Sequence, residues 1–310
     1  MYAPLISICV PAYRKPAFVT RLLDSVLRQD YKQVEVIISD DSPDESVNLA
    51  IAPYINKLNL RYYHNQPAKG SPVNWNFALD QARGELLMLL HQDDWLYAPD
   101  ALRSYVEAFG SDSSLDFVFC KNIAVREDGS EIVLQALPGL LHRLDRLPNH
   151  LVRADVIGPP SNVMVRSTVT TRYDERFIWL VDVDYYVRLL KQGCRYRYLD
   201  RHLVSIGLHA DQTTNYCREN ESIILKENIL FAAKLEAGAF RDWKIYDYFW
   251  RLLRNHRVRS QEDLLQSGVS AEQVPPVISH MLALERRIPL RLLHLGPVSK
   301  LLMFVSYVQQ

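Results

Sequence analysis

Two adjacent aspartates follow a continuous apolar stretch in the segment LLMLLHQDDWLYAPD, residues 86–100. The apolar run before Asp93 and Asp94 is typical of a buried strand. Like charges side by side raise each other's proton affinity unless a cation or hydrogen-bond donors satisfy them. A helix cap explains the pair poorly, because Asp100 already stands at the start of the next expected helix. Carboxylate oxygens suit Mg²⁺ or Mn²⁺, which proteins hold together with substrate phosphates, so Asp93 and Asp94 are predicted metal ligands.

A second acidic pair, Asp40 and Asp41, ends the apolar stretch VEVIISDD. It could form a turn and a helix cap, or it could place a carboxylate where the N–H of a nucleobase would bind. Tyr13, after the earlier stretch LISICVPAY, offers a ring that could stack on a base. The sequence contains neither GxGxxG nor GxxxxGK[ST], which argues against a dinucleotide cofactor and against a P-loop nucleotide hydrolase.

Strand-like and helical patterns alternate along residues 5–125. This alternation predicts an α/β fold, with a doubly wound and mostly parallel sheet covered by helices on both faces. Such sheets bind ligands at the carboxyl ends of their strands. Because residues 11–13, 40–42 and 91–94 each follow a predicted strand, we expect all three polar clusters at one edge of the sheet.

The composition sets limits on the class of protein. Among 310 residues, the 36 Lys and Arg balance the 36 Asp and Glu, so no basic footprint predicts a nucleic-acid partner. Four cysteines without CxxC spacing favour reduced thiols and a cytoplasmic location. Neither a signal peptide nor an apolar stretch long enough to span a membrane is expected. We expect a catalytic domain over residues 1–215 and a helical region over residues 216–310.

Three ordered motifs make the chain similar to the family 2 glycosyltransferases of the GT-A fold. They are VPAY, SVLRQ and SDDS in the first 42 residues, followed by ARGELLMLLHQDDWLYAPDAL. The resemblance covers roughly residues 4–215. It implies a GT-A sheet with a helical C-terminal extension. It also implies transfer of a sugar from a nucleotide-diphosphate sugar, with a UDP-sugar as the first candidate, to a saccharide or lipid-linked saccharide. Polysaccharide, O-antigen or other glycoconjugate synthesis would be the setting.

The resemblance also assigns roles to individual residues. Asp41, with Asp40, would bind the base and ribose, and Tyr13 would lie against the base. Asp93 and Asp94 would bind Mn²⁺ or Mg²⁺ on the diphosphate. The remaining residues expected around the nucleotide are Pro11, Ala12, Asn76, His91 and Gln92. His91 departs from the family pattern, which has an aspartate at this position, and it could bind the ribose instead.

The segment VDVDYYVRLLKQG resembles the family's catalytic helix, with Arg188 and Gly193 fixing the register. This register makes Asp182 the general base of an inverting transfer, although Val181 replaces the family's glutamate. Asp182 and Asp184 would point about 200° apart on a helix, so they cannot act as a close pair. Asp184 is then expected to cap the helix or to face solvent.

His209 follows the last strand-like segment, YLDRHLVSIGL. It is either a surface histidine or, as the resemblance implies, a group near the metal, since imidazole is an acceptable Mn²⁺ ligand. The segment ERRIPLRLLHLGPVSKLLMFVSYV mixes basic and apolar residues. It could lie on the inner face of a membrane, pack on the domain, or pair two subunits of a homo-oligomer. A nucleotidyltransferase and a non-catalytic binding protein stay open as alternatives.

Overall fold

The computed structural model describes residues 2–133 and 138–310, and it divides the chain into two compact units. Unit 1 comprises Met1–Asp145, Val156–Glu175 and Tyr185–Ala210. Unit 2 comprises Arg146–Asp155, Arg176–Asp184 and Asp211–Gln310. The last change of unit lies close to the expected boundary at residue 215, but two short earlier segments also belong with the C-terminal helices. The functions that we assigned to the two regions stay proposals.

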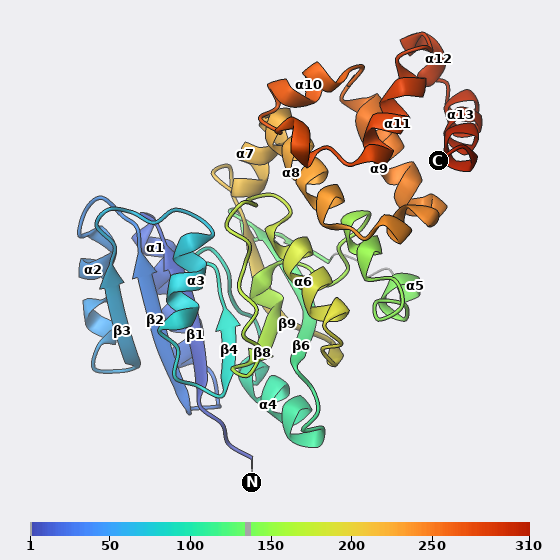
Figure 1. Cartoon of the computed structure of the whole chain (residues 1–310). Helices are drawn as coiled ribbons and strands as arrows, with labels where there is room; N and C mark the ends of the chain where they lie inside the picture. The colour runs from blue at the N-terminus through green and yellow to red at the C-terminus, as the bar shows by residue number, and fades with distance from the viewer. Residues whose placement is uncertain (1, 134–137) are drawn as a thin grey trace. The chain divides into compact units, whose positions relative to one another are not determined.

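Unit 1 contains a nine-stranded sheet in the order β3-β2-β1-β4-β8-β6-β9-β5, with β7 paired to β6 (Figure 1). The strands are β1 Ile6–Ala12, β2 Val34–Asp40, β3 Asn59–His64, β4 Leu86–Leu89, β5 Trp95–Leu96, β6 Phe117–Arg126, β7 Glu131–Ile132, β8 Val163–Arg166 and β9 Tyr196–Leu208. The first four strands in space are parallel, and β6 pairs in parallel with β9. Strand β8 runs antiparallel to both of its neighbours. The predicted α/β fold with a mostly parallel sheet is confirmed.

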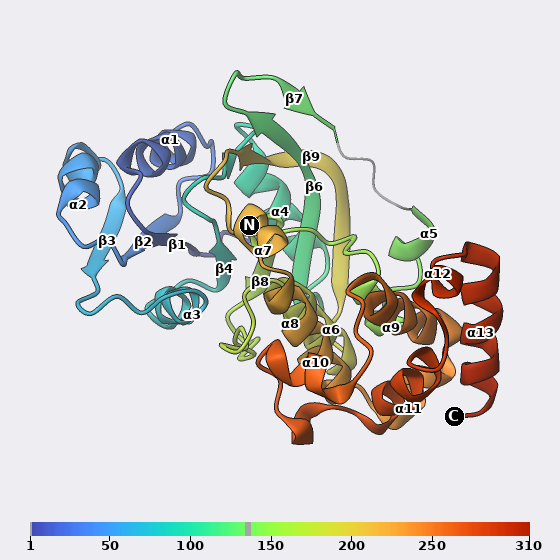
Figure 2. The ribbon, with the colours of Figure 1, turned by 90° about the horizontal axis from the view of Figure 1, so that it is seen from above.

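Helices cover both faces of this sheet (Figure 2). Helices α1 (Pro16–Leu27), α2 (Ser46–Ile51) and α4 (Ala101–Ser111) lie on one face, and α3 (Val73–Asp80) lies on the other. Alternate residues of β1 explain this arrangement. Ile6, Ile8 and Val10 are fully buried in one core with α1, α2 and α4. Cys9 faces the other way, and its thiol donates to the Ala78 carbonyl of α3, 3.4 Å away.

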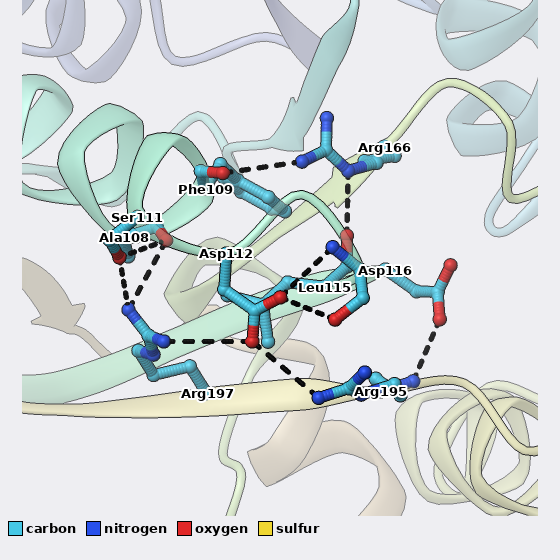
Figure 3. Close-up of polar contacts among 10 residues, drawn as sticks. Ala108, Phe109, Ser111, Asp112, Leu115, Asp116, Arg166, Arg195 and Arg197 are labelled. Atoms are coloured by element: carbon cyan, nitrogen blue, oxygen red, sulfur yellow. Dashed lines mark hydrogen bonds and ion pairs between the residues drawn. The ribbon is translucent and has the colours of Figure 1, made fainter.

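Polar contacts fix the amino ends of β6 and β9 (Figure 3). Asp116 and Arg195 directly precede these two strands. The Asp116 N–H donates to the Arg195 carbonyl at 2.8 Å, and the Arg195 N–H donates to the Asp116 carboxylate at 2.7 Å. The Arg166 side chain donates to the Leu115 carbonyl at 2.6 Å, which ties β8 to the same end. Asp112 lies 3.6 Å from the guanidinium of Arg195. These charged groups therefore stabilise the sheet at the end opposite the carboxyl edge of the parallel strands.

Helices dominate unit 2. They are α7 Thr213–Glu219, α8 Glu221–Lys234, α9 Trp243–Asn255, α10 Gln261–Gln266, α11 Pro276–Glu285, α12 Leu290–Leu293 and α13 Gly296–Val308. Tyr246, Phe249 and Trp250 of α9 are fully buried and form the centre of this bundle. The expected helical C-terminal region is present. None of the helices formed by the described residues combines the length and hydropathy needed to cross a bilayer.

Candidate active site

The three predicted polar clusters meet at one edge of the sheet. Strand β1 is the parallel neighbour of both β2 and β4, with Ala12 opposite Asp40 and Cys9 opposite Leu89. The ladder continues past the strand ends, since the N–H of Asp41 donates to the Ala12 carbonyl at 2.9 Å. Residues 11–13, 40–42 and 91–94 therefore border one carboxyl edge, which is where parallel sheets bind ligands.

Tyr13 presents its ring at this edge, and Gln92 holds it there. The Tyr13 N–H donates to Gln92 Oε1 at 3.0 Å, and Gln92 Nε2 donates to the Tyr13 carbonyl at 3.1 Å. Both polar groups of Gln92 are thus used to join the end of β1 to the loop after β4. Tyr13 is 49% exposed, although the Arg14 guanidinium lies 5.1 Å from the centre of its ring, so part of the ring surface stays accessible to a ligand.

The turn after Tyr13 has an unusual backbone. Arg14 and Lys15 have φ of 54° and 53°, values that L-residues with side chains rarely adopt. The Arg14 N–H donates to Ser42 Oγ at 2.6 Å, which holds the turn against the loop after β2. Strained turns of this kind concentrate at ligand-binding sites. The conformation is therefore consistent with the ligand-binding role predicted for the edge beside Tyr13.

The two aspartates after β2 have different surroundings. Asp40 is fully buried and accepts from the Ser42 N–H at 2.8 Å and from the Tyr62 hydroxyl at 2.8 Å. Asp41 accepts one bond on each oxygen, from Asn65 Nδ2 at 2.9 Å and from the Gly70 N–H at 2.8 Å. Each carboxylate oxygen has two lone pairs, so Asp41 can still accept a donor from a ligand. Asp40 is instead an internal group of the turn.

Asn65 was missed in the sequence, although it directly follows β3 as Asp41 follows β2. Its Nδ2 lies within hydrogen-bond distance of Ser39 Oγ (2.9 Å) and Asn74 Oδ1 (3.2 Å), and it donates to Asp41. These side chains are all buried, and a satisfied buried polar network has one favoured geometry. Asn65 therefore fixes the orientation of Asp41. Its position at the end of β3 was the signal that could have found it.

Asp93 and His209 lie side by side. His209 Nε2 is 2.9 Å from Asp93 Oδ2, and its ring packs 4.9 Å from that of Phe18. Burial raises the pKa of Asp93, but the hydrogen bond from His209, together with weaker effects in the same direction, outweighs burial and brings that pKa below its ordinary value. The structure thus brings together two predicted ligands that are 116 residues apart in the sequence.

Asp94 points into the protein. Its two oxygens accept from Ser161 Oγ at 2.5 Å and from the Gly207 N–H at 3.2 Å, and the residue is 2% exposed. Burial, and then the charge of Asp93, raise the pKa of Asp94 well above its ordinary value. Asp94 therefore joins the loop after β4 to β9, and the geometry favours Asp93 over Asp94 as a ligand.

His91 and Asn76 also have local partners. The His91 ring packs 4.6 Å from that of Trp75, and burial lowers the pKa of His91, which favours a neutral imidazole. Asn76 is buried and exchanges two bonds of 2.9 Å with the backbone of Tyr173. Asn76 therefore holds a loop against α3 through its amide, and its predicted contact with a nucleotide stays a prediction.

Arg21 was not singled out in the sequence, yet it supports the backbone of Asp93. It lies on α1, donates to the Asp93 carbonyl at 2.7 Å and stacks 3.9 Å from the centre of the Trp95 ring. Gly207 packs against the same carbonyl, because a Cβ at this position would lie 2.4 Å from it. These contacts fix the backbone that carries Asp93.

A Gly207→Ala substitution is expected to push residues 93–94 away from β9. Overpacking of this kind costs about 1–3 kcal/mol, which denaturant unfolding would measure. Gly139→Ala is the matched control, because nothing lies within 4 Å of a Cβ there. Equal stability of the two variants would contradict the tight packing of Gly207 on the Asp93 carbonyl.

The residues present can hold a divalent cation together with a ligand. The described part of the chain contains no group of three or more His, Cys, Asp or Glu arranged for a metal. Asp93 and His209 are two residues of these types, and their facing atoms are 2.9 Å apart. Ligand atoms at about 2.1 Å from an octahedral ion lie about 3 Å from each other, so the pair fits one ion. Substrate phosphates and water would then complete its coordination.

Asp182 begins α6 (Val181–Lys191), and the segment around it belongs to unit 2. Burial raises the pKa of Asp182 to about 6, and the charge of Glu227 acts in the same direction. A carboxylate with this pKa is ionised at neutral pH and is a stronger base than an ordinary aspartate. Asp184, on the same helix, is buried and forms an ion pair with Lys234 of α8.

Glu227 of α8 fixes the backbone that leads into α6. Its carboxylate accepts from the N–H groups of Ile178, Trp179 and Leu180, each at 2.8 Å. The residue is 2% exposed. No sequence pattern indicates this contact, because the partners of Glu227 are backbone groups 47 to 49 residues away.

Replacing Glu227 with alanine is expected to lower the free energy of unfolding by about 3 kcal/mol, since three N–H groups would lose their acceptor. Denaturant unfolding measures this loss. Glu219→Ala is the control, because Glu219 is exposed on the neighbouring helix. A loss no larger than that of the control would contradict the role of Glu227.

Comparison with known proteins decides the family. A model described as "Glycosyl transferase family 2" matches residues 7–161, half of the chain. The chain belongs to this family. Family membership confirms the expected enzyme class, a glycosyltransferase, and it favours neither the nucleotidyltransferase nor the non-catalytic alternative.

Several relatives match over most of the chain. An uncharacterized protein of Mycobacterium tuberculosis is 30% identical over 73% of this chain and 75% of its own length. The chondroitin synthase of Escherichia coli is 25% identical over 73% of this chain, but the match spans only 33% of that synthase. The matched part of the chain therefore corresponds to a third of the synthase.

Solved structures share the fold. The Staphylococcus aureus TarS fragment 1–349 in complex with UDP-GlcNAc has a TM-score of 0.64 and 20% identity, covering 98% of this chain and 91% of that one. The mannosyltransferase PcManGT of Pyrobaculum calidifontis, in complex with GDP-Man and Mn²⁺, has a TM-score of 0.58 and 14% identity, covering 100% and 87%. The GT-A fold expected from the sequence is confirmed.

Proposed function

We propose that this glycosyltransferase moves a sugar from a nucleoside-diphosphate sugar to an acceptor hydroxyl, with inversion of the anomeric centre. The observation that carries the proposal is the pairing of Asp93 with His209 at the sheet edge that also presents Tyr13 and Asp41. Fold neighbours hold UDP-GlcNAc and GDP-Man, which supports a nucleotide-sugar donor, and a UDP-sugar is the first candidate. The chondroitin synthase relative supports polysaccharide or other glycoconjugate synthesis.

Donor binding would use side chains that are exposed or that can accept a further hydrogen bond. The exposed Tyr13 ring would stack on the base. Asp41, held by Asn65 and Gly70, would accept an N–H of the base or a ribose hydroxyl. The buried or fully bonded side chains of Asp40, Asn76 and Gln92 would fix the surrounding backbone. This proposal narrows the set of nucleotide contacts expected from the sequence.

Asp93 and His209 would hold Mn²⁺ or Mg²⁺. A bound ion neutralises the charge that grows on the departing diphosphate. Asp94, with both oxygens bonded inside the protein, would position Asp93 through the loop that they share. His91, as a neutral imidazole, lies beside this pair and could donate to the ribose or a phosphate.

Asp182 would act as the general base. Its carboxylate would take the proton of the acceptor hydroxyl while the hydroxyl oxygen bonds to the anomeric carbon and the bond to the diphosphate breaks. Direct attack on the opposite face gives inversion in one step, so no covalent nucleophile is required. The register of the α6 segment and the raised pKa of Asp182 support this role.

We place the activity in the cytoplasm, since all four cysteines are free thiols, as in reducing compartments. A saccharide or a lipid-linked saccharide at the inner membrane face would be the acceptor.

A calorimetric binding screen of nucleoside diphosphates and their sugars, with and without Mn²⁺, tests the proposal. We expect one nucleotide to bind, and to bind more tightly with Mn²⁺. Failure of every nucleotide to bind in the presence of metal would contradict donor binding at this edge.

A further inference from the structure

Helix α13 turns apolar side chains outward and two serines inward. Its buried residues are Ser299, Met303 and Ser306. The serines are bonded inside unit 2, because Trp250 Nε1 donates to Ser299 Oγ at 3.1 Å and the Tyr246 hydroxyl lies 2.7 Å from Ser306 Oγ. These bonds fix the rotation of the helix about its axis.

The opposite side of α13 carries one apolar stripe. Leu301, Phe304, Val305 and Val308 are 67%, 41%, 41% and 79% exposed. Their spacing of three, four and seven residues places them within about 100° of the helix circumference. A surface helix normally directs such a stripe to the core, so here the stripe is available to a partner.

Neighbouring residues enlarge this stripe. Helix α12 packs beside α13 and is followed by the turn to it, as Figure 1 shows at the C-terminal end of the chain. We call the whole surface the α12–α13 face, and its members are Leu290, Leu292, Leu295, Leu301, Phe304, Val305 and Val308. Trp243 of α9 stacks on Phe304 at 5.8 Å and is itself 39% exposed. Seven of the seventeen large hydrophobic side chains exposed in the described residues lie on this face.

The charged residues of the segment that forms this face are all basic. Residues 286–310 contain Arg286, Arg287, Arg291 and Lys300 and no aspartate or glutamate. Lys300 is already paired with Asp247 at 2.8 Å, so it contributes little to an outside partner. The three arginines are exposed. The segment that forms the face therefore combines exposed apolar side chains with three exposed arginines.

We infer that the α12–α13 face docks on the surface of an anionic lipid bilayer, with α13 lying in the plane of the interface. Its 13 residues extend about 20 Å, less than the roughly 30 Å of a bilayer core, so it would lie on the membrane. Apolar residues in the headgroup region, with arginines beside anionic lipids, match this mode of binding. A symmetric dimer through the same face is the alternative. It would bring the arginines of two copies to one interface, and repulsion between these like charges would disfavour it.

Co-sedimentation of the full chain with vesicles tests the inference. Vesicles of phosphatidylcholine and phosphatidylglycerol in equal parts should bind the protein about 100-fold more tightly than phosphatidylcholine alone, since three arginines each add favourable energy near an anionic surface. Phe304→Ser combined with Val305→Ser should weaken this binding at least about 10-fold, because two apolar side chains that would enter the membrane interface are lost. Arg287→Ser combined with Arg291→Ser should remove most of the preference for the anionic vesicles.

Leu49→Ser is the matched control, because Leu49 is 73% exposed but lies on α2 in unit 1. This substitution should leave vesicle binding unchanged. Equal melting temperatures would show that the variants are folded. Wild-type binding by the Phe304/Val305 variant, or no binding of the wild type to anionic vesicles, would overturn the inference. A third outcome would also overturn it. In that outcome, light scattering shows the wild type as a dimer, the Phe304/Val305 variant as a monomer, and neither binds vesicles. The assay contains no donor sugar, so its failure would leave the proposed transfer reaction untouched.

Discussion

Replacing Asp182 with asparagine is expected to lower the rate of sugar transfer by about 10²–10⁴-fold, the usual contribution of a general base. The amide cannot take the proton of the acceptor hydroxyl. Binding of the nucleoside diphosphate should be unchanged, because the proposed donor site consists of residues of unit 1. Steady-state transfer rates and calorimetric nucleotide binding, measured on the same preparation, separate the two effects. Near wild-type turnover would exclude Asp182 as the base.

Asp184→Asn is the matched control on the same helix. Asp184 is paired with Lys234 inside unit 2, so its loss should lower stability while folded molecules keep most of their turnover. The wild-type pH profile adds a second readout. Because the base must be ionised and the pKa of Asp182 is about 6, the rate should fall as pH drops through about 6 and level off above it. The Asp182→Asn variant should lack this limb.

The second large effect is expected at Asp93. Asp93→Asn removes the anionic oxygen beside His209, so nucleoside diphosphate binding should lose its Mn²⁺ dependence and transfer should fall by about 100-fold or more. Metal titrations in the presence of UDP measure the first effect, and transfer assays measure the second.

Asp94→Asn is the neighbouring control and separates the two aspartates. An asparagine at 94 can still accept from the Gly207 N–H and can donate to Ser161 Oγ, so the loop should keep its position. Mn²⁺ affinity should then stay close to that of the wild type. A larger loss of metal affinity in Asp94→Asn than in Asp93→Asn would return the ligand role to Asp94.

Strand ends were the part of the site that the sequence predicted well. Apolar stretches followed by Tyr13, Asp41 and Asp93 indicated one edge, because a parallel sheet brings the carboxyl ends of its strands together. His209 could be proposed only through the family resemblance. No local pattern indicates that β9 places it 2.9 Å from Asp93.

Roles that depend on side-chain direction could not be predicted. Asp93 and Asp94 are adjacent and chemically identical, yet one faces His209 and the other faces Ser161 and Gly207. Asp40, Asn76 and Gln92 are polar residues at the expected edge whose partners are backbone groups and neighbouring side chains. The sequence shows the type and approximate position of a polar group. Whether that group keeps a hydrogen-bonding position for a ligand depends on tertiary contacts.

The outward stripe of α13 shows the same limit in an apolar helix. Periodicity identifies which residues share a face, and Leu301, Phe304, Val305 and Val308 do. It cannot say whether that face is buried. Here Trp250 and Tyr246 bind the serines of the other side and so decide the orientation.

Pulsed electron paramagnetic resonance of Mn²⁺ bound together with UDP tests the central assignment, that Asp93 and His209 share the metal of the donor diphosphate. The wild type should show a nitrogen coupling from the imidazole of His209. The coupling should be absent in His209→Ala and preserved in Asp94→Asn. Mn²⁺ that binds with UDP in the wild type but shows no nitrogen coupling would contradict the assignment.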